Sequence, residues 1–194
     1  SVPVFYGFSN AFYETGNKNA SLSLTAQHWY FHNDNATMTN LQQNTGYSKW
    51  RENERVWNGQ NINLALNADW LCSSKDYFAF KATYVNNPSE YVSEGKGELR
   101  EEGMDMQPFT YFNEDKVAYY INTYNLYYKH TFHKKSWLEA TARFNLNGNE
   151  TKGVRTEDYT SWEYNNIYDF DNFRYSGGIE VSYTAPLGKH TLDI

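Results

Sequence analysis

The stretch NINLALNADWLCSSKDYFAFKATYV, residues 61–85, alternates between apolar and polar side chains on both sides of a short polar segment. Before the segment, Ile62, Leu64 and Leu66 share one face, and polar residues occupy most positions on the other. The alternation resumes at Phe78, after a predicted turn at residues 73–76. A period of two on both sides of a tight turn predicts an antiparallel β-hairpin.

Three further segments show the same pattern, at residues 4–31, 123–147 and 173–194, with predicted turns at 16–19, 133–136 and 186–189. No segment shows a helical period. The connections at residues 32–60, 87–122 and 147–172 are polar, and we expect them to be long loops. The predicted fold is therefore all-β: an antiparallel up-and-down meander of about eight long strands, forming a transmembrane β-barrel or a segment of a larger one.

Two features of the strands favour a membrane over a soluble core. Several strands reach the length of about 9–11 residues that a tilted membrane-spanning strand needs. Aromatic side chains stand near the ends of the apolar face and aliphatic ones near its middle, as expected for the girdles of a barrel. The predicted lipid-facing girdle consists of Tyr30, Trp70, Tyr84, Tyr124, Phe132, Tyr175 and Tyr183. Alternation alone is equally typical of a soluble antiparallel sheet with one wet face.

Composition excludes several classes of function. Aromatic residues make up 19% of the chain, and the net charge of −6 argues against binding to nucleic acid. Cys72 is the only cysteine, so the sequence offers neither an internal disulfide nor a cysteine-based zinc site. No apolar run is long enough for a transmembrane helix. The five histidines are not spaced for a shared metal ion, and no catalytic motif occurs. We expect no enzymatic activity, no cofactor and no bound metal.

The candidate residues for ligand binding lie in the polar connections, where aromatic rings occur among charged side chains. Such rings stack on flat or apolar ligand surfaces and carry a polar edge. The carboxylates near residue 163 match no EF-hand spacing, so calcium is not indicated. The candidate ligand-binding residues are Trp50, Trp57, Tyr159, Trp162, Tyr164 and Tyr168.

The final arm, residues 189–194, is too short to span a membrane. An open edge within a bilayer is not tolerated. We therefore expect residues 1–194 to form a single β-barrel region that is a segment of a larger barrel, without a plug domain.

The segments YNLYYKHTFHKKSWLEATARFNLNGN and YSGGIEVSYTAPLGKHTLDI resemble the barrel region of TonB-dependent receptors of the Bacteroidetes type. The resemblance lies in an Asn-Leu, an aromatic pair, a short basic turn and a Leu-x-Ala-x-Ala strand. It implies a bacterial outer-membrane location, contact with membrane lipid, and uptake or surface binding of a nutrient through a barrel of about 22 strands. It also implies coupling to a TonB-type energy-coupling complex through parts of the protein other than these residues.

In the membrane interpretation, the four short turns face the periplasm and the three polar connections face outside. The alternative is a soluble extracellular β-sandwich that binds carbohydrate through Trp50, Trp57 and Trp162.

Overall fold

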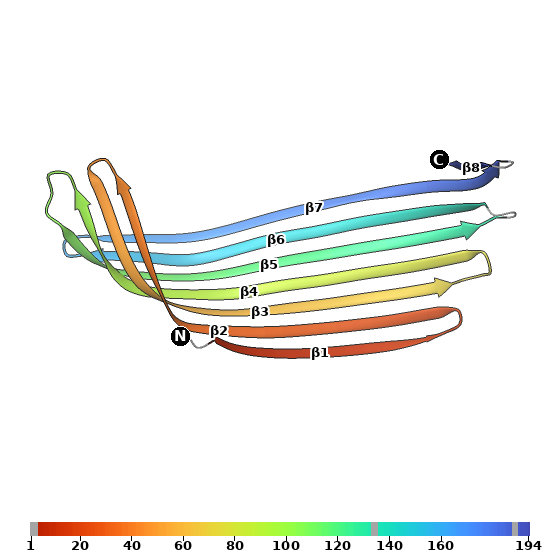
Figure 1. The fold of residues 1–194 in the computed structure, drawn as a ribbon, viewed down its shortest axis with the longest axis horizontal. Helices are drawn as coiled ribbons and strands as arrows, with labels where there is room; N and C mark the ends of the chain where they lie inside the picture. Colours follow the sequence, from red (N-terminus) through yellow and green to blue (C-terminus); the bar gives the residue numbers. More distant parts are fainter. Residues whose placement is uncertain (1–3, 133–135, 188–189) are drawn as a thin grey trace.

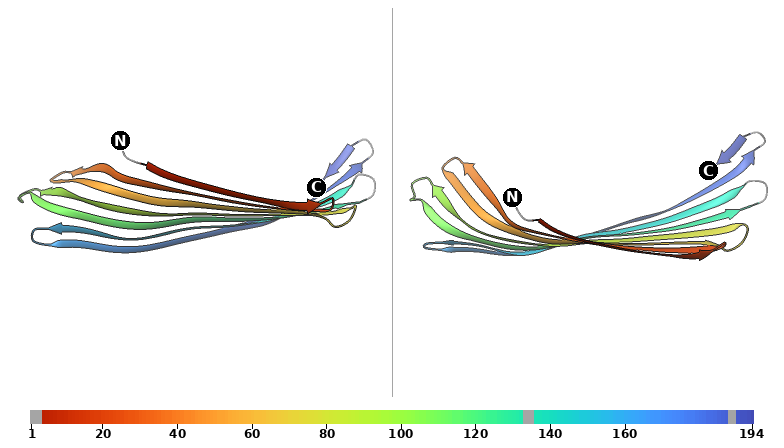
Figure 2. Two further views of the ribbon diagram at one scale, coloured as in Figure 1. Left: turned by 90° about the horizontal axis from the view of Figure 1, so that it is seen from below. Right: turned by 60° about the horizontal axis from the view of Figure 1, so that its bottom comes forward.

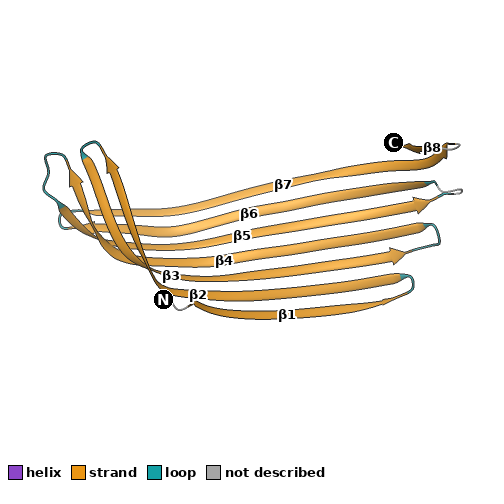
Figure 3. Ribbon diagram, in the orientation of Figure 1, coloured by secondary structure: helices purple, strands orange, loops and turns teal. Residues whose placement is uncertain are grey.

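A computed structural model describes residues 4–132, 136–187 and 190–194. The described chain forms one sheet of eight antiparallel strands in the order of the sequence, which confirms the predicted all-β meander (Figures 1 and 3). The strands are β1 (Val4–Asn17), β2 (Ala20–Asn44), β3 (Tyr47–Leu71), β4 (Asp76–Glu101), β5 (Gln107–Thr131), β6 (Trp137–Tyr159), β7 (Glu163–Leu187) and β8 (His190–Asp193). Within the described ranges, no helix is long and apolar enough to cross a membrane.

The three polar connections are not loops, and this part of the prediction was wrong. Residues 32–60 belong almost entirely to β2 and β3, which pair as far as Asn44 and Tyr47 around the turn at Thr45 and Gly46. The connections at 87–122 and 147–172 continue β4–β5 and β6–β7 in the same way. Both faces of these extensions carry polar side chains, so the strands lack the apolar alternation that marks a half-buried strand.

The short turns follow their predicted positions closely where the structure describes them. Between β1 and β2, Asn17 Oδ1 accepts hydrogen bonds from the backbone N–H groups of Asn19 and Ala20. Between β3 and β4, Ser73 Oγ accepts hydrogen bonds from the backbone N–H groups of Lys75 and Asp76. Residues 133–135 and 188–189 of the other two predicted turns lie outside the described residues. Pro186 and Leu187, predicted as turn residues, belong to β7.

The register assigns the side chains of the paired residues to one of two faces. We call the face with Leu64 and Leu66 face A, and the face with Asn63 and Asn67 face B. The proximal section is the part of the sheet nearest the turns at 18–19 and 72–75. On the strands β2–β7 it ends at about Phe31, Asn61, Asn87, Tyr119, Asn149 and Asn172, respectively. The distal section is the remainder, ending in the β2–β3, β4–β5 and β6–β7 tips.

Face A of the proximal section is apolar and exposed. Even on central strands, Leu64 is 39% exposed, Leu126 49% and Phe144 44%. On β3 the apolar side chains run from Ile62 to Trp70, a span that matches the length of a membrane-crossing strand. Face B behind them is lined by amides, hydroxyls and charged groups, including Asn63, Asn67 and Lys81.

The distal section has the opposite distribution of polarity. Its face A is rich in carboxylates, among them Glu52, Glu94 and Glu98. The small hydrophobic core lies on its face B and consists of Leu99, Phe109, Tyr111 and Tyr159. The apolar surface therefore changes face along the length of the same strands.

The distal hairpins β2–β3 and β4–β5 bend away from the line of β6 and β7 (Figures 1 and 2). Glycines on face B of β4 permit this bend, because they leave room for β3 to approach β5. A Cβ on Gly97 would lie 2.4 Å from the Phe109 ring and 2.3 Å from the Trp50 carbonyl oxygen. A Cβ on Gly95 would lie 2.1 Å from the Glu52 carbonyl oxygen. Glycine at such positions allows a sheet to curve.

Candidate ligand-binding face

Face B of the distal section contains a cavity of about 540 Å³ between the hairpin tips. It is lined by Tyr47, Lys49, Leu99, Glu101, Met104, Gln107, Arg155, Glu157, Tyr159, Trp162 and Tyr164. Three of the six predicted ligand residues, Tyr159, Trp162 and Tyr164, meet here. The cavity combines aromatic walls with both signs of charge, which are the features of a site for an amphipathic ligand.

Glu157 is the electrostatic centre of the cavity and is only 2% exposed. Its carboxylate accepts hydrogen bonds from Lys49, from Arg155 at 2.9 Å and from Tyr159 at 2.9 Å. Burial alone would raise the pKa of this carboxyl, but the bonds from Lys49 and Tyr159 and the nearby positive charge hold the pKa below its ordinary value. Burial and the bond to Glu157 raise the pKa of the Tyr159 hydroxyl. Glu157 therefore remains a carboxylate, bound by the Lys49 and Arg155 cations and by the neutral Tyr159 hydroxyl.

Trp162 closes the β6–β7 tip by stacking on Tyr159. The ring centroids are 3.9 Å apart and the planes differ by 10°. The indole Nε1 donates a hydrogen bond to Gln107 Oε1 at 3.1 Å, and the Tyr159 backbone N–H bonds to the Trp162 carbonyl. These contacts fix one wall of the cavity.

A second group of rings crosses face B closer to the proximal section. The Phe31 and Trp57 centroids are 4.5 Å apart, and those of Trp57 and Tyr91 are 5.4 Å apart. The Arg55 guanidinium lies 4.2 Å from the Tyr91 centroid. Tyr168, another predicted ligand residue, is on the same face and donates hydrogen bonds to Asp115 and Asn113.

The remaining predicted ligand residue, Trp50, is separated from the others. It pairs with Glu98 on face A, whereas Trp57, seven positions along β3, lies on face B. The loop interpretation concealed this separation, because side-chain direction alternates in a strand.

The sequence reasoning missed Lys49, Arg51 and Tyr111, which join β3 to β5 and β6. The Arg51 guanidinium lies 4.0 Å from the Tyr111 centroid, and that of Arg155 lies 5.6 Å from it. No local pattern could have found these contacts, since they depend on the bend of β3 over β5.

All seven predicted girdle residues lie on face A. Trp70, Phe132 and Tyr183 are near the proximal turns, and Phe132 packs edge-on against Tyr183 at 6.0 Å. At the other margin the rings do not share one row. Tyr84 is level with Asn122, whereas Tyr30 is level with Gln60, further along the sheet.

Large rings also lie on face B of β1. Tyr6 pairs with Phe31, and Phe8 pairs with Trp29. Tyr6 is 71% exposed and Phe8 70%. These rings extend the aromatic part of face B to the edge of the sheet.

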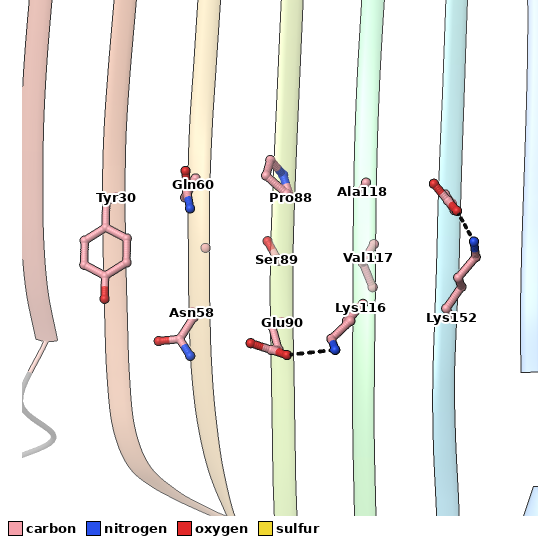
Figure 4. Close-up of a pocket in the computed structure, with 12 residues that line it drawn as sticks. Tyr30, Asn58, Gln60, Pro88, Ser89, Glu90, Lys116, Val117, Ala118 and Lys152 are labelled. Carbon is pink, nitrogen blue, oxygen red and sulfur yellow. Dashed lines mark ion pairs between the residues drawn. The ribbon is translucent and has the colours of Figure 1, made fainter. Parts of the chain in front are cut away.

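A groove of about 380 Å³ crosses the strands where the apolar part of face A ends (Figure 4). Pro88 and Ala118 form an apolar floor, and Tyr30 lies at one end. Lys116 pairs with Glu90 at 3.4 Å, and Lys152 pairs with Glu150 at 2.6 Å. This row of charges marks the boundary between the two sections on face A.

Comparison with known proteins does not assign the chain to a family. No family model matches the chain, and no curated protein matches it. A solved structure titled "Pore forming protein" aligns with 95% of this chain and 95% of its own, at 5% identity and a TM-score of 0.16. That likeness is too weak to indicate a common fold or function.

Proposed function

We propose that this chain forms part of the wall of a bacterial outer-membrane β-barrel, with face A of the proximal section in contact with lipid. Face B lines the lumen, and the distal section extends beyond the membrane on the outer side. The role of the barrel is uptake or surface binding of a nutrient, as the resemblance to TonB-dependent receptors implies.

The observation that carries this proposal is the exposed apolar part of face A. Soluble monomers rarely expose apolar patches larger than a few hundred Å², yet here leucine and phenylalanine side chains remain exposed across adjacent central strands. The patch spans β3 from Ile62 to Trp70 and then gives way to paired charges. A band of limited height with rings near its margins fits the hydrocarbon core of a membrane.

Strand length supports the same interpretation. β2–β7 each have 23 to 26 residues, more than twice the number needed to cross a bilayer. Their distal halves are polar on face A, as expected for a wall in water. A soluble sandwich packs two sheets over a shared core, whereas the described residues form one sheet.

Quenching of tryptophan fluorescence by brominated lipid tests the proposal. Three variants of the full chain each keep one tryptophan, Trp70, Trp29 or Trp57, with the others replaced by phenylalanine. After refolding into vesicles, acyl-brominated lipid is expected to quench Trp70 on face A strongly. Trp29 and Trp57 lie on face B and are expected to be quenched weakly.

Equal quenching of the three variants would overturn the proposal. Intact source cells give a second test, with an antibody against residues 147–172 at the β6–β7 tip. We expect the antibody to label the cell surface and an outer-membrane band. A band confined to the soluble fraction contradicts the membrane assignment.

A further inference from the structure

The distal part of face B has an excess of positive charge, although the chain as a whole carries −6. Between the rows of Lys49 and Trp57, the positive side chains on this face are Lys49, Arg51, Arg55 and Arg155. The carboxylates in the same rows are Glu157 and Asp115. Most of the acidic groups of the distal section lie on face A, so the two faces have opposite electrostatic character.

The four cations have different partners. Lys49 and Arg155 both bind Glu157. Within the described part of the chain, neither Arg51 nor Arg55 forms an ion pair, and Arg55 donates a hydrogen bond to Met38 Sδ at 3.7 Å. Arg51 Nε is buried without a hydrogen-bond acceptor among the described residues. An arginine presents five N–H donors, so these two leave most of their binding capacity unused.

Both guanidinium groups are held against aromatic rings. Arg51 lies 4.0 Å from the Tyr111 centroid and Arg55 lies 4.2 Å from the Tyr91 centroid. Arg51 pairs with Gly97 of β4, which has no side chain to separate Arg51 from β5. A guanidinium placed over a ring is restrained, while its N–H edge can bind an oxyanion with two hydrogen bonds.

Polar side chains separate the two arginines. Asn53 lies between them on β3, and Ser93 is level with Arg55 on β4. They are 5% and 7% exposed. Four residues along a strand correspond to about 13 Å, so one ligand with two or more anionic groups can reach both guanidinium groups.

We propose that Arg51 and Arg55 form a binding site for a soluble solute that carries several oxyanion groups, such as phosphates or carboxylates. The inference rests on the proposed function, because it identifies the ligand class of the lumen-facing surface. Lipid headgroups are not the expected source, since the apolar band lies on the opposite face of the sheet.

Isothermal titration of the full chain in detergent with inositol hexakisphosphate tests this site, and uncharged myo-inositol is the control ligand. We expect the hexakisphosphate to bind and myo-inositol not to bind. The double variant Arg51→Gln, Arg55→Gln is expected to weaken binding by about tenfold or more, because each charge-assisted pair of hydrogen bonds contributes substantially. Arg51→Lys, Arg55→Lys keeps the charge and the fold but loses the two-bond geometry, and a smaller loss is expected.

Arg100→Gln is the matched control, because Arg100 lies on face A, its side chain is 66% exposed and it pairs with Glu98. We expect it to leave the affinity unchanged. The inference is overturned if the wild-type chain does not bind the hexakisphosphate, if the double glutamine variant binds equally well, or if Arg100→Gln weakens binding as much. Lipid quenching of Trp70 is independent of these arginines, so failure of this site and failure of the barrel proposal are distinguishable.

Discussion

The proximal and distal sections are built from the same strands, yet their apolar side chains lie on opposite faces. Proximally, face A is apolar and exposed, and face B is polar. Distally, face A is acidic, and face B holds the rings of Phe109, Tyr111 and Tyr159. A strand presents two independent surfaces because its side chains alternate, so one strand can face lipid over part of its length and enclose a polar ligand site beyond it.

The sections also differ in what holds them together. In the proximal section the side-chain hydrogen bonds join adjacent strands, as between Asn67 of β3 and Ser23 of β2. In the distal section Lys49 of β3 binds Glu157 of β6, across two intervening strands. The glycines of β4 permit this contact, and the sheet bends there. The bend of the distal hairpins therefore depends on individual residues of β4.

The largest expected effect comes from a charge on the proximal face A. Leu126→Arg places a guanidinium near the middle of the apolar band, between Phe80 and Ala142. We expect the free energy of unfolding in phospholipid vesicles to fall by about 2–4 kcal/mol. Urea titration followed by tryptophan fluorescence measures this change.

The matched control is Thr123→Arg, on face B at a similar height and paired with Thr83 and Asn145. We expect a change within about 0.5 kcal/mol, as for a substitution at a solvated surface. If both variants lose the same free energy, the two faces do not differ in environment, and the comparison between them is wrong.

A smaller effect is expected where the distal sheet bends. Gly97→Ala sets a methyl group against the Phe109 ring and the Trp50 carbonyl, which costs about 1–3 kcal/mol by overpacking. Gly178→Ala is the control, because a Cβ there meets no atom within 4 Å. Unfolding of both variants in urea measures the difference, and equal stabilities would show that the bend tolerates a larger residue.

The smallest effect concerns the ionisation of Glu157. Its pKa is lowered in the folded chain, so its contribution to stability is fully present above the ordinary glutamate pKa of about 4.3 and is lost as the pH falls through the lower folded value. Near-ultraviolet circular dichroism of the stacked Tyr159 and Trp162 rings is expected to weaken over this acidic range. In Glu157→Gln the pH dependence over that range should disappear, and its persistence would assign the transition to another group.

The meander and the faces of the proximal section can be predicted from the amino-acid sequence alone. Alternation in residues 61–85 identified a hairpin and its apolar side correctly, because each half-buried strand carries that signal locally. The distal strands escaped detection, because polar side chains occur on both of their faces and interrupt the alternation of apolar and polar residues that marks a half-buried strand. Only pairing with neighbours shows that residues 32–60 continue β2 and β3.

Which candidate functional side chains meet depends on the packing of the strands in three dimensions. Tyr159, Trp162 and Tyr164 were expected from their ring content, and they line one cavity. Trp50 and Trp57 were both expected to bind ligand from one loop, but they lie on opposite faces of β3, since side-chain direction alternates along a strand. Contacts such as Arg51 with Tyr111 and Lys49 with Glu157 depend on a bend permitted by Gly95 and Gly97. Long-range packing of this kind leaves no periodic trace in the sequence.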